Sequence, residues 1–446
     1  MKFYLVGILV LLFTFSSAFA QSLSGYDVSP FAGVHSAEMQ PAAIEGLPNK
    51  IEIGIIGAGS TVLGKSFFPN LSILNNISSE NVFSYLGLLK LVSTESFTRY
   101  TVAFPSIAYQ IQNGDALSFR INMRSFIYSK YSGLNIKGLI QGIQDESWVD
   151  RTYSNQFARL SLLSWTEFAG TYGKQFELTN GSKIKAGVTL KFLQGLGDAR
   201  YNFGTIEYQT SGDSLLNYLN MDVNYAYNDQ IEELISNEGF RFFGSGGVGV
   251  DFGATWEWQG NNPDNYPNYK AKIGASITDV GTIFFKYAKQ NLLSVQITDL
   301  STSTFSGITS PTELIDSIDR VLDVSTTKND GRYQLSLPTS LNINADYQIK
   351  NDFYASINQR LTFIKHPQET GKYDHIYTLV VTPRYDNYEH GIYLPIQYSN
   401  FNGMDLGLSL RWKGIALGSS NIISRWTKPD NKILGDVFLM TKIRIK

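Results

Sequence analysis

Two glycine-rich stretches of the sequence have the residues and spacing of nucleotide-binding loops. Gly59 to Ser66 satisfies GxxxxGK[ST], in which backbone amides cradle phosphates and the lysine reaches the terminal ones. Such a loop needs a helix that begins at the lysine, but Pro69 follows before a helix is established. Gly244 to Gly249 satisfies GxGxxG, but the residues after it alternate with period two instead of starting a helix. We therefore expect no nucleotide partner.

The histidines and cysteines offer little material for catalysis. The chain has four histidines, no cysteine and a net charge of −2. His35, His366, His375 and His390 have no GxSxG or similar companion to act on as bases. The absence of cysteine excludes disulfides, a lipid anchor and thiolate metal ligands. We expect no enzyme activity, no cofactor and no metal site, and the charge argues against a nucleic-acid partner.

The sequence from Ala116 to Tyr128 separates its charged residues from its apolar residues. Leu117 and Phe119 begin an apolar series at every second position, whereas Arg120 and Arg124 lie on the opposite face of an extended strand. The alternation lasts about twelve residues, near the nine to eleven that a tilted strand needs to cross a bilayer. One face therefore meets lipid and the other meets water, as in a membrane barrel.

Charged side chains occupy the second face of later stretches as well. Lys183, Lys185 and Lys191 share one face of the stretch that ends at Leu193. Three lysines on one face cannot point into lipid at tolerable cost, so they must line water or meet acids such as Glu167. We predict either a solute path or a structural network that fills and stiffens the lumen, because ion pairs perturb the same residues in both cases. The candidate lumen-lining residues are Arg120, Arg124, Glu167, Lys183, Lys185, Lys191, Asp251, Glu257 and Arg411.

These patterns predict an all-β fold, a transmembrane antiparallel β-barrel of about fourteen strands with long extracellular loops. Tight turns are expected at Asn113-Gly114-Asp115 and at Thr179 to Ser182. Residues 129–156 are expected to form a polar loop, and short helices are expected around 80–91 and 311–323. The composition agrees, since aromatic residues reach 13% and suit the girdles at the two membrane interfaces.

The N-terminus predicts export. Residues 1–20 combine a lysine, an apolar run and small residues that end at Ala20, which is the pattern of a cleaved signal peptide. We divide the chain into this signal peptide, an N-terminal plug or periplasmic segment at 21–49, and an outer-membrane barrel at 50–446. The expected location is the cell outer membrane, without lipoprotein anchoring, and the expected partners include outer-membrane lipid.

Four further stretches have recognisable spellings: Gln40-Pro41-Ala42-Ala43, Gly247 to Thr255, Ala275 to Gly281, and Leu417 to Asn421. They resemble a Bacteroidota outer-membrane barrel family of unknown function, which is distantly similar to the fatty-acid-transporter barrels. Gln40 stands where the family has asparagine. The resemblance implies fourteen strands, an N-terminal plug formed by Gln21 to Asn49, and a lateral gap for hydrophobic molecules. Pro105, inside a strand, marks the candidate gap because proline removes a ladder hydrogen bond.

The leading functional hypothesis is passage of a small or hydrophobic molecule across the outer membrane. The alternative is a non-catalytic scaffold barrel that binds surface or secretion proteins, with partner contacts carried by the charged residues from Thr210 to Phe240. Occupancy of the lumen discriminates the two hypotheses, since a plugged and fully ion-paired lumen without a side gap would argue against transport.

Overall fold

The computed structural model describes residues 25–64, 94–111, 114–132, 152–179, 181–211, 215–228, 245–259, 267, 269–301, 328–365, 373–427 and 436–445. The expected signal peptide, the two expected helices at 80–91 and 311–323, and most of the loop residues between 210 and 240 beyond the strands lie outside these residues.

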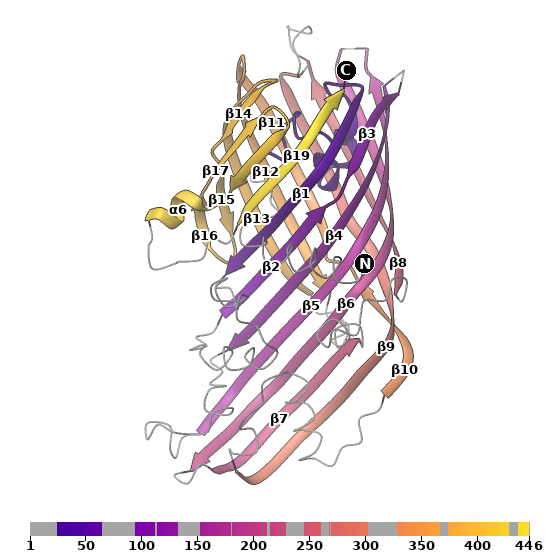
Figure 1. Cartoon of the computed structure of the whole chain (residues 1–446). Helices are drawn as coiled ribbons and strands as arrows, with labels where there is room; N and C mark the ends of the chain where they lie inside the picture. Colours follow the sequence, from indigo (N-terminus) through magenta and orange to yellow (C-terminus); the bar gives the residue numbers. More distant parts are fainter. Residues whose placement is uncertain are drawn as a thin grey trace, which may run out of the picture.

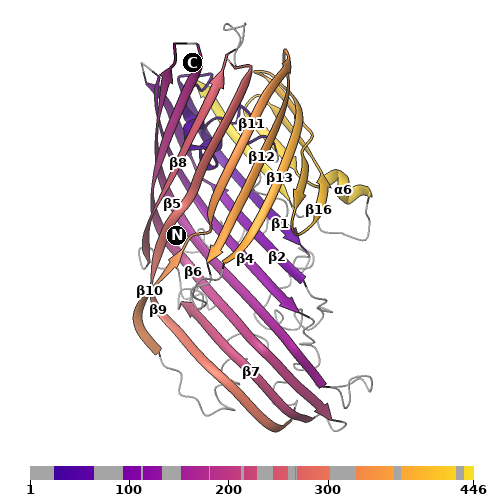
Figure 2. The same ribbon diagram turned by 180° about the vertical axis from the view of Figure 1, so that it is seen from behind.

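Nineteen strand segments form one antiparallel sheet, which closes into a barrel because β1 (Ile51–Gly64) pairs with β19 (Val437–Ile445). In five places two consecutive segments lie one after the other in a single strand position of the barrel. The nineteen segments therefore make fourteen strands, as the sequence predicts. Figures 1 and 2 show the barrel from opposite sides. The other segments are β2 (Thr94–Ala103), β3 (Ser106–Ile111), β4 (Asp115–Ser132), β5 (Thr152–Glu177), β6 (Lys183–Ser211), β7 (Leu215–Asn228), β8 (Gly246–Trp258), β9 (Ala271–Ser301), β10 (Lys328–Ser336), β11 (Thr339–Lys350), β12 (Phe353–Lys365), β13 (Tyr373–Asp386), β14 (His390–Tyr393), β15 (Ile396–Ser399), β16 (Gly403–Leu406), β17 (Leu408–Trp412) and β18 (Ile415–Ser419).

Proline or glycine lies at the interruption in four of these five strands. Pro105 lies between β2 and β3, Pro338 between β10 and β11, Pro395 between β14 and β15, and Gly407 between β16 and β17. Proline has no N–H to donate to the ladder, so a strand that contains it must break or bulge there. The interruption at Pro105 is therefore one of several in this wall.

The outer face of the barrel is apolar. Exposed and buried positions alternate along the strands, and the exposed positions hold large side chains such as Leu117 and Leu190, the latter 68% exposed. The intervening positions of the same two strands hold the buried Arg120 and Lys191. This confirms the assignment of faces made from the period-two pattern, and it is the arrangement that a bilayer requires of a barrel.

Three strands are much longer than the sequence patterns predict. β5, β6 and β9 have 26, 29 and 31 residues, and their lower ends extend past the barrel body in one sheet with β7 (Figure 1). The loop expected at 129–156 is therefore wrong at both of its ends, since β4 reaches Ser132 and β5 begins at Thr152. The expected strand length was the length needed to cross a bilayer, and this length does not limit a sheet that continues into water.

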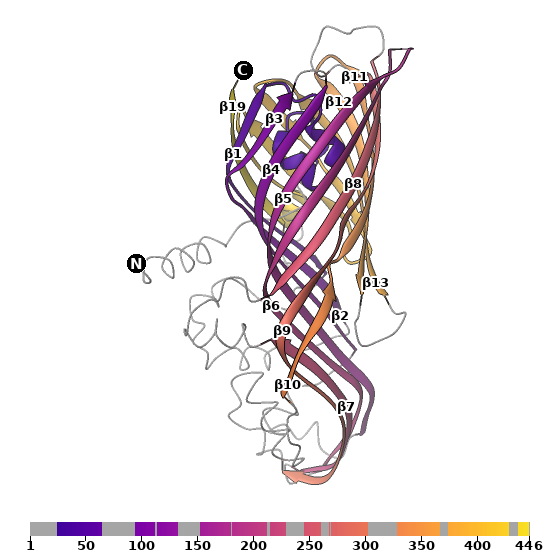
Figure 3. The same cartoon turned by 90° about the vertical axis from the view of Figure 1, so that its right-hand side faces the viewer.

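Two short 3-10 helices near the N-terminus lie inside the barrel, where Figure 3 shows them between the strands. They are η2 (Gly33–Glu38) and η3 (Pro41–Ile44). The six-residue helix α6 (Ile422–Thr427), which was not predicted from the sequence, lies beside β16 on the outside (Figure 1). Leu406 N donates to Ser424 Oγ at 2.7 Å, so α6 rather than a strand covers that edge of β16. No described helix is long and apolar enough to cross a membrane.

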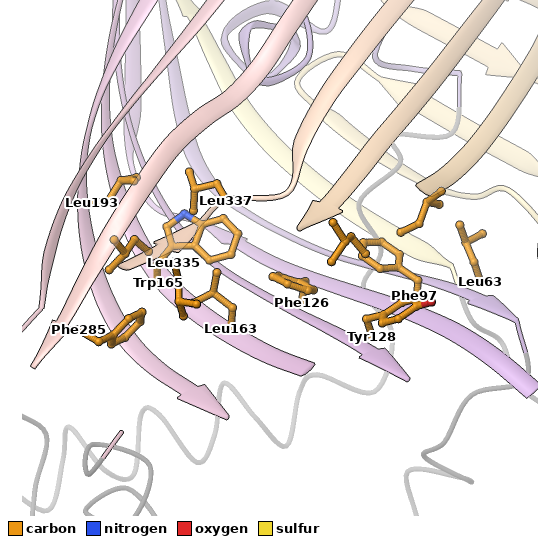
Figure 4. Close-up of a cluster of buried hydrophobic side chains, with 13 residues drawn as sticks. Leu63, Phe97, Phe126, Tyr128, Leu163, Trp165, Leu193, Phe285, Leu335 and Leu337 are labelled. Carbon is orange, nitrogen blue, oxygen red and sulfur yellow. The ribbon is translucent and has the colours of Figure 1, made fainter. Parts of the chain in front are cut away.

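A cluster of apolar side chains lies on the inner face, farther along the strands than the two 3-10 helices. Figure 4 shows these side chains spread across the inside of the barrel. We call this cluster the apolar belt, and it consists of Leu63, Phe97, Phe126, Tyr128, Leu163, Trp165, Leu193, Ile283, Phe285, Leu335, Leu337, Ile364 and Ile376.

Candidate functional site

The structure places eight of the nine predicted lumen-lining residues in buried positions inside the barrel. Arg120, Arg124, Glu167, Lys185, Lys191, Asp251, Glu257 and Arg411 are each at most 8% exposed. Lys183 differs, because it stands at the first position of β6 and pairs with the exposed Glu177 at 3.6 Å. Lys183 is therefore a rim residue.

Arg124 and Lys191 are the two cations of a central charged cluster. Arg124 donates to both carboxylate oxygens of Asp279, at 2.7 and 2.9 Å, and to Glu167 at 3.0 Å. Lys191 Nζ lies 2.7 Å from Asp279 Oδ1 and 2.8 Å from Asp251 Oδ2. These five side chains come from β4, β5, β6, β8 and β9, so the cluster joins five strands that are consecutive in the barrel wall.

Asp279 is the centre of this cluster, and it was not among the residues predicted from the sequence. Its backbone has a φ of 61°, in the left-handed region that few residues other than glycine adopt. The pairing of β8 with β9 shifts register between Val250 and Phe252, and Asp279 N donates to Asp251 Oδ1 at 2.7 Å across this irregularity. β9 itself is continuous from Ala271 to Ser301, so the irregularity lies in its pairing with β8. The exposed Ile277 and Val280 are three positions apart instead of two, and this lapse in the alternation was the signal that could have found the residue.

A second charged cluster surrounds Arg384 and Arg411. Arg384 binds Asp346 through two parallel bonds of 2.8 and 2.6 Å, a geometry that makes strong charge-assisted hydrogen bonds. Arg411 donates to Asp386 at 3.0 Å, and Ser29 of the N-terminal segment donates to the same carboxylate at 2.6 Å. Only Arg411 of this cluster was predicted from the sequence. Asp386 reaches Arg411 from β13, and Asp346 reaches Arg384 from β11, so these pairs form only when strands that are distant in the chain lie near one another in the sheet.

Residues 25–49 are attached to the inner wall by many polar contacts. Ser276 Oγ donates to Met39 O at 2.5 Å, and Gln40 Nε2 donates to Ala275 O at 3.1 Å. Lys185 Nζ pairs with Glu257 at 2.8 Å and also reaches Glu45 O at 3.3 Å. Gln40 also caps η3, since its side-chain oxygen accepts from Ala42 N.

A row of glycines on three neighbouring strands makes room for this segment. Gly173 pairs with Gly187, and Gly187 pairs with Gly253. A Cβ at Gly187 would lie 2.4 Å from Pro41 C and 2.5 Å from Ala42 N, which is closer than real atoms approach. We call these three glycines the glycine row, and they allow the backbone of η3 to lie directly on the wall.

Burial shifts the pKa of three titratable groups in the N-terminal segment. It raises the pKa of Asp27 to about 6, with Arg360 opposing the rise. It lowers the pKa of His35 to about 3, helped by Lys442 and Arg120. It raises the pKa of Glu45 to about 7, where Lys185 opposes the rise and Asp115 adds to it. His35 is therefore neutral at neutral pH.

The lumen wall changes character where the charged cluster meets the apolar belt. Along the inner face of β4, Arg120, Asn122 and Arg124 are followed by Phe126 and Tyr128. The Arg124 guanidinium lies 5.0 Å from the centre of the Trp165 ring, so a cation–π contact joins the two regions. Among the residues that the structure describes, no group of three or more acids or histidines could hold a metal ion.

The wall is irregular at the candidate lateral gap. Pro105 is exposed on the outer face, and Phe104 N still donates to Ile121 O at 2.9 Å on the β4 side. On the other side, β1 pairs with β3 up to Gly54 and with β2 from Gly57 onward. The two intervening residues, Ile55 and Ile56, bulge outward and are exposed. The ladder is thus interrupted at this point and continuous on either side of it.

The two glycine-rich stretches are strands where they are described. β1 remains extended through Gly64, and β8 begins at Gly246. Lys65 and Ser66, the last two residues of the GxxxxGK[ST] pattern, lie outside the described residues.

Comparisons with known proteins give one family and several solved barrels. The profile of a family described as "Family of unknown function (DUF5723)" matches residues 41–419. The structure is similar to the TodX deltaS2S3 mutant monoaromatic hydrocarbon channel, with a TM-score of 0.42, 10% identity and coverage of 96% of each chain. It is also similar to a Pseudomonas aeruginosa FadL homologue, with a TM-score of 0.26, 10% identity, and coverage of 95% of this chain and 96% of that one. No curated protein matches the chain.

Proposed function

The chain belongs to DUF5723, a family of unknown function, and we propose that it is an outer-membrane channel that admits small hydrophobic molecules. The observation that carries this proposal is the apolar belt inside the lumen. A water-filled pore has a polar lining, whereas binding sites for apolar molecules are lined mainly by apolar and aromatic side chains with a few polar groups.

The polar groups at one end of the belt favour a defined orientation of the bound molecule. Arg124 contacts the Trp165 ring of the belt, and Arg99 lies 5.7 Å from the centre of the Phe97 ring. An apolar molecule with one polar or anionic end would place its apolar body in the belt and its other end toward these guanidinium groups. Export through a cleaved signal peptide and location in the outer membrane are part of the same proposal, supported by the apolar outer face.

The N-terminal segment lies between the belt and the end of the barrel with the short turns, and it fills the lumen there. Tyr26, Ala32, Val34 and Ile44 are each at most 2% exposed. In this proposal residues 25–49 act as a plug, and a hydrophobic molecule leaves the belt only when the plug moves or when the wall opens at an interruption such as Pro105. The lumen is not fully ion-paired, so it does not meet the condition that would argue against transport.

Native mass spectrometry of the protein, extracted gently from its own membrane, tests the proposal. We expect reproducibly bound apolar molecules on the wild type and their loss from the belt variant Phe126→Asn. Ser118→Ala, on the inner face of the same strand but outside the belt, is the control and should retain them. An empty wild-type barrel, or equal occupancy in Phe126→Asn, would argue against a hydrophobic-molecule channel.

The sheet extension supports a second candidate function. β5, β6, β7 and β9 pair beyond the barrel body and present strands to the surroundings of the membrane. A scaffold barrel would use this extension to hold a surface or secretion protein. The same mass spectra discriminate the two functions, because a stoichiometric protein partner on an otherwise empty barrel would favour the scaffold.

A further inference from the structure

Arg120 is a buried cation without a hydrogen-bond partner. It projects from β4 into the lumen, is 2% exposed, and its Nε, Nη1 and Nη2 atoms all lack a partner in the described part of the chain. A guanidinium cannot lose its proton in a protein, so it must remain charged. Because an uncompensated buried charge is strongly unfavourable, some group must neutralise it.

A small cavity lies beside Arg120. His35, Glu38, Ala103, Ser106, Asn122 and Met440 are the other residues that line it, and it has room for about one water molecule. Two further polar atoms at the cavity, His35 Nε2 and Ser106 Oγ, also lack partners among the described residues. Gly54 faces the same space, since a Cβ there would lie 2.2 Å from Ser106 Oγ and 3.1 Å from the His35 ring.

Glu167 attracts Arg120, but this acid is already shared between Arg124 and Lys191. Glu167 accepts from Arg124 at 3.0 Å and from Asn122 at 3.0 Å. Glu38, which lines the cavity, lies 3.8 Å from Arg124. His35 carries no negative charge in either protonation state, so it cannot compensate Arg120.

We propose that this cavity is a binding site for one small monovalent anion such as chloride, held by the Arg120 guanidinium and the Ser106 hydroxyl. A halide is larger than the water molecule that the cavity accommodates, so the lining side chains must move slightly to admit it, and it supplies the charge that water lacks. The site is separate from the apolar belt, and it lies directly behind the wall interruption at Pro105, where Ser106 begins β3.

Crystals of the full chain grown in bromide test the site directly. We expect an anomalous bromide peak within hydrogen-bond distance of Arg120 and Ser106. A water-sized peak without anomalous signal at that position would overturn the proposal.

Thermal unfolding in detergent, with chloride replaced stepwise by gluconate, gives an independent measurement. We expect the wild-type midpoint to rise with chloride, and we expect Ser106→Ala to need about tenfold more chloride for the same rise, because a hydrogen bond to a charged group is lost. Arg120→Met removes the unpaired charge, so it should be at least as stable as the wild type in gluconate and should not respond to chloride. Ser118→Ala, on the same inner face but not at the cavity, should respond like the wild type. A wild-type midpoint that is independent of chloride, or an equal response in Arg120→Met, would overturn the proposal even if Ser106→Ala failed to fold.

Discussion

Asp279 shows how one residue can organise charges that come from several strands. Its left-handed backbone conformation interrupts the regular alternation of β9 and turns a carboxylate toward Arg124 and Lys191. Short polar side chains such as aspartate tolerate this conformation better than most residues, although it still costs free energy. The cost is offset by three charge-assisted hydrogen bonds from the two cations. We infer that the irregularity in the pairing of β8 with β9 exists because it places this carboxylate.

Removing one cation of the central cluster should destabilise the barrel severely. In Lys191→Met, Asp251 would lose its cation and Asp279 would keep only Arg124. Breaking a buried pair by deleting one partner typically costs about 3–5 kcal/mol, because the remaining charge is uncompensated. Thermal unfolding in detergent, compared with the wild type at neutral pH, measures the loss.

Lys174→Met is the matched control for this prediction. Lys174 pairs with Asp115 at 3.5 Å, but its side chain is 47% exposed. An exposed pair of this kind contributes about 0–1 kcal/mol, so the control should unfold close to the wild type. Equal losses for the two variants would show that burial does not determine the effect.

Glu45 should make attachment of the N-terminal segment depend on pH. Burial raises its pKa from 4.5 to about 7, so the folded state binds this proton more tightly than the unfolded state. The stabilisation is therefore fully present below pH 4.5 and is lost as pH rises through 7, by about 1.4 kcal/mol for each unit of the pKa difference. Unfolding midpoints of the wild type and Glu45→Gln between pH 4.5 and 8 test this. The stability of the wild type relative to the variant should fall with rising pH, and a constant difference would contradict the assignment.

At the scale of elements, the glycine row determines how closely η3 approaches the wall. In Gly187→Val the new side chain would overlap the backbone of Pro41 and Ala42, so the segment must move away from β6. The chain has no cysteine, so a cysteine introduced at the buried Ala42 is a unique probe of this movement. We expect a thiol reagent to label it at least about tenfold faster when Gly187→Val is present, because detachment costs less free energy there.

Gly170→Val is the control for the glycine row. Gly170 lies on β5 with open space where its Cβ would be, and valine suits an exposed strand position. Labelling of the cysteine at position 42 should therefore stay at the wild-type rate. Faster labelling in this control would attribute the effect to general loosening of the barrel.

The sequence predicts well which face of a strand each residue occupies, but it predicts poorly which charged side chains pair with one another inside the barrel. Period two is a local property, so the outward Leu117 and the inward Arg124 could both be assigned from their neighbours. Which charges meet depends on register and on closure of the barrel, and neither is encoded within one strand. Asp346 and Asp386 were missed for this reason. Phe126 and Tyr128 were missed as belt residues because an apolar inner position removes the alternation by which the faces were recognised.

At the scale of the whole molecule, the lumen has two parts with different chemistry. One part holds residues 25–49 among buried ion pairs such as Lys442 with Glu52, at 2.9 Å. The other part is the apolar belt. A hydrophilic solute therefore meets a filled region and then an apolar one, whereas a hydrophobic solute finds favourable surface in the second part. This difference predicts selectivity against hydrophilic solutes.

Release of a sucrose-sized sugar from loaded lipid vesicles tests this selectivity. Vesicles that contain the wild type should release the sugar no faster than protein-free vesicles if residues 25–49, which lie buried inside the barrel, act as the proposed plug. Gly187→Val should raise the release rate several-fold, since displacement of η3 removes part of the obstruction, and Gly170→Val should leave the rate unchanged. Rapid release through the wild type would identify a general pore and contradict both the obstruction and the selectivity. Slow release through all three proteins, combined with faster labelling at position 42 in Gly187→Val, would instead assign the barrier to the charged clusters and the belt rather than to the N-terminal segment.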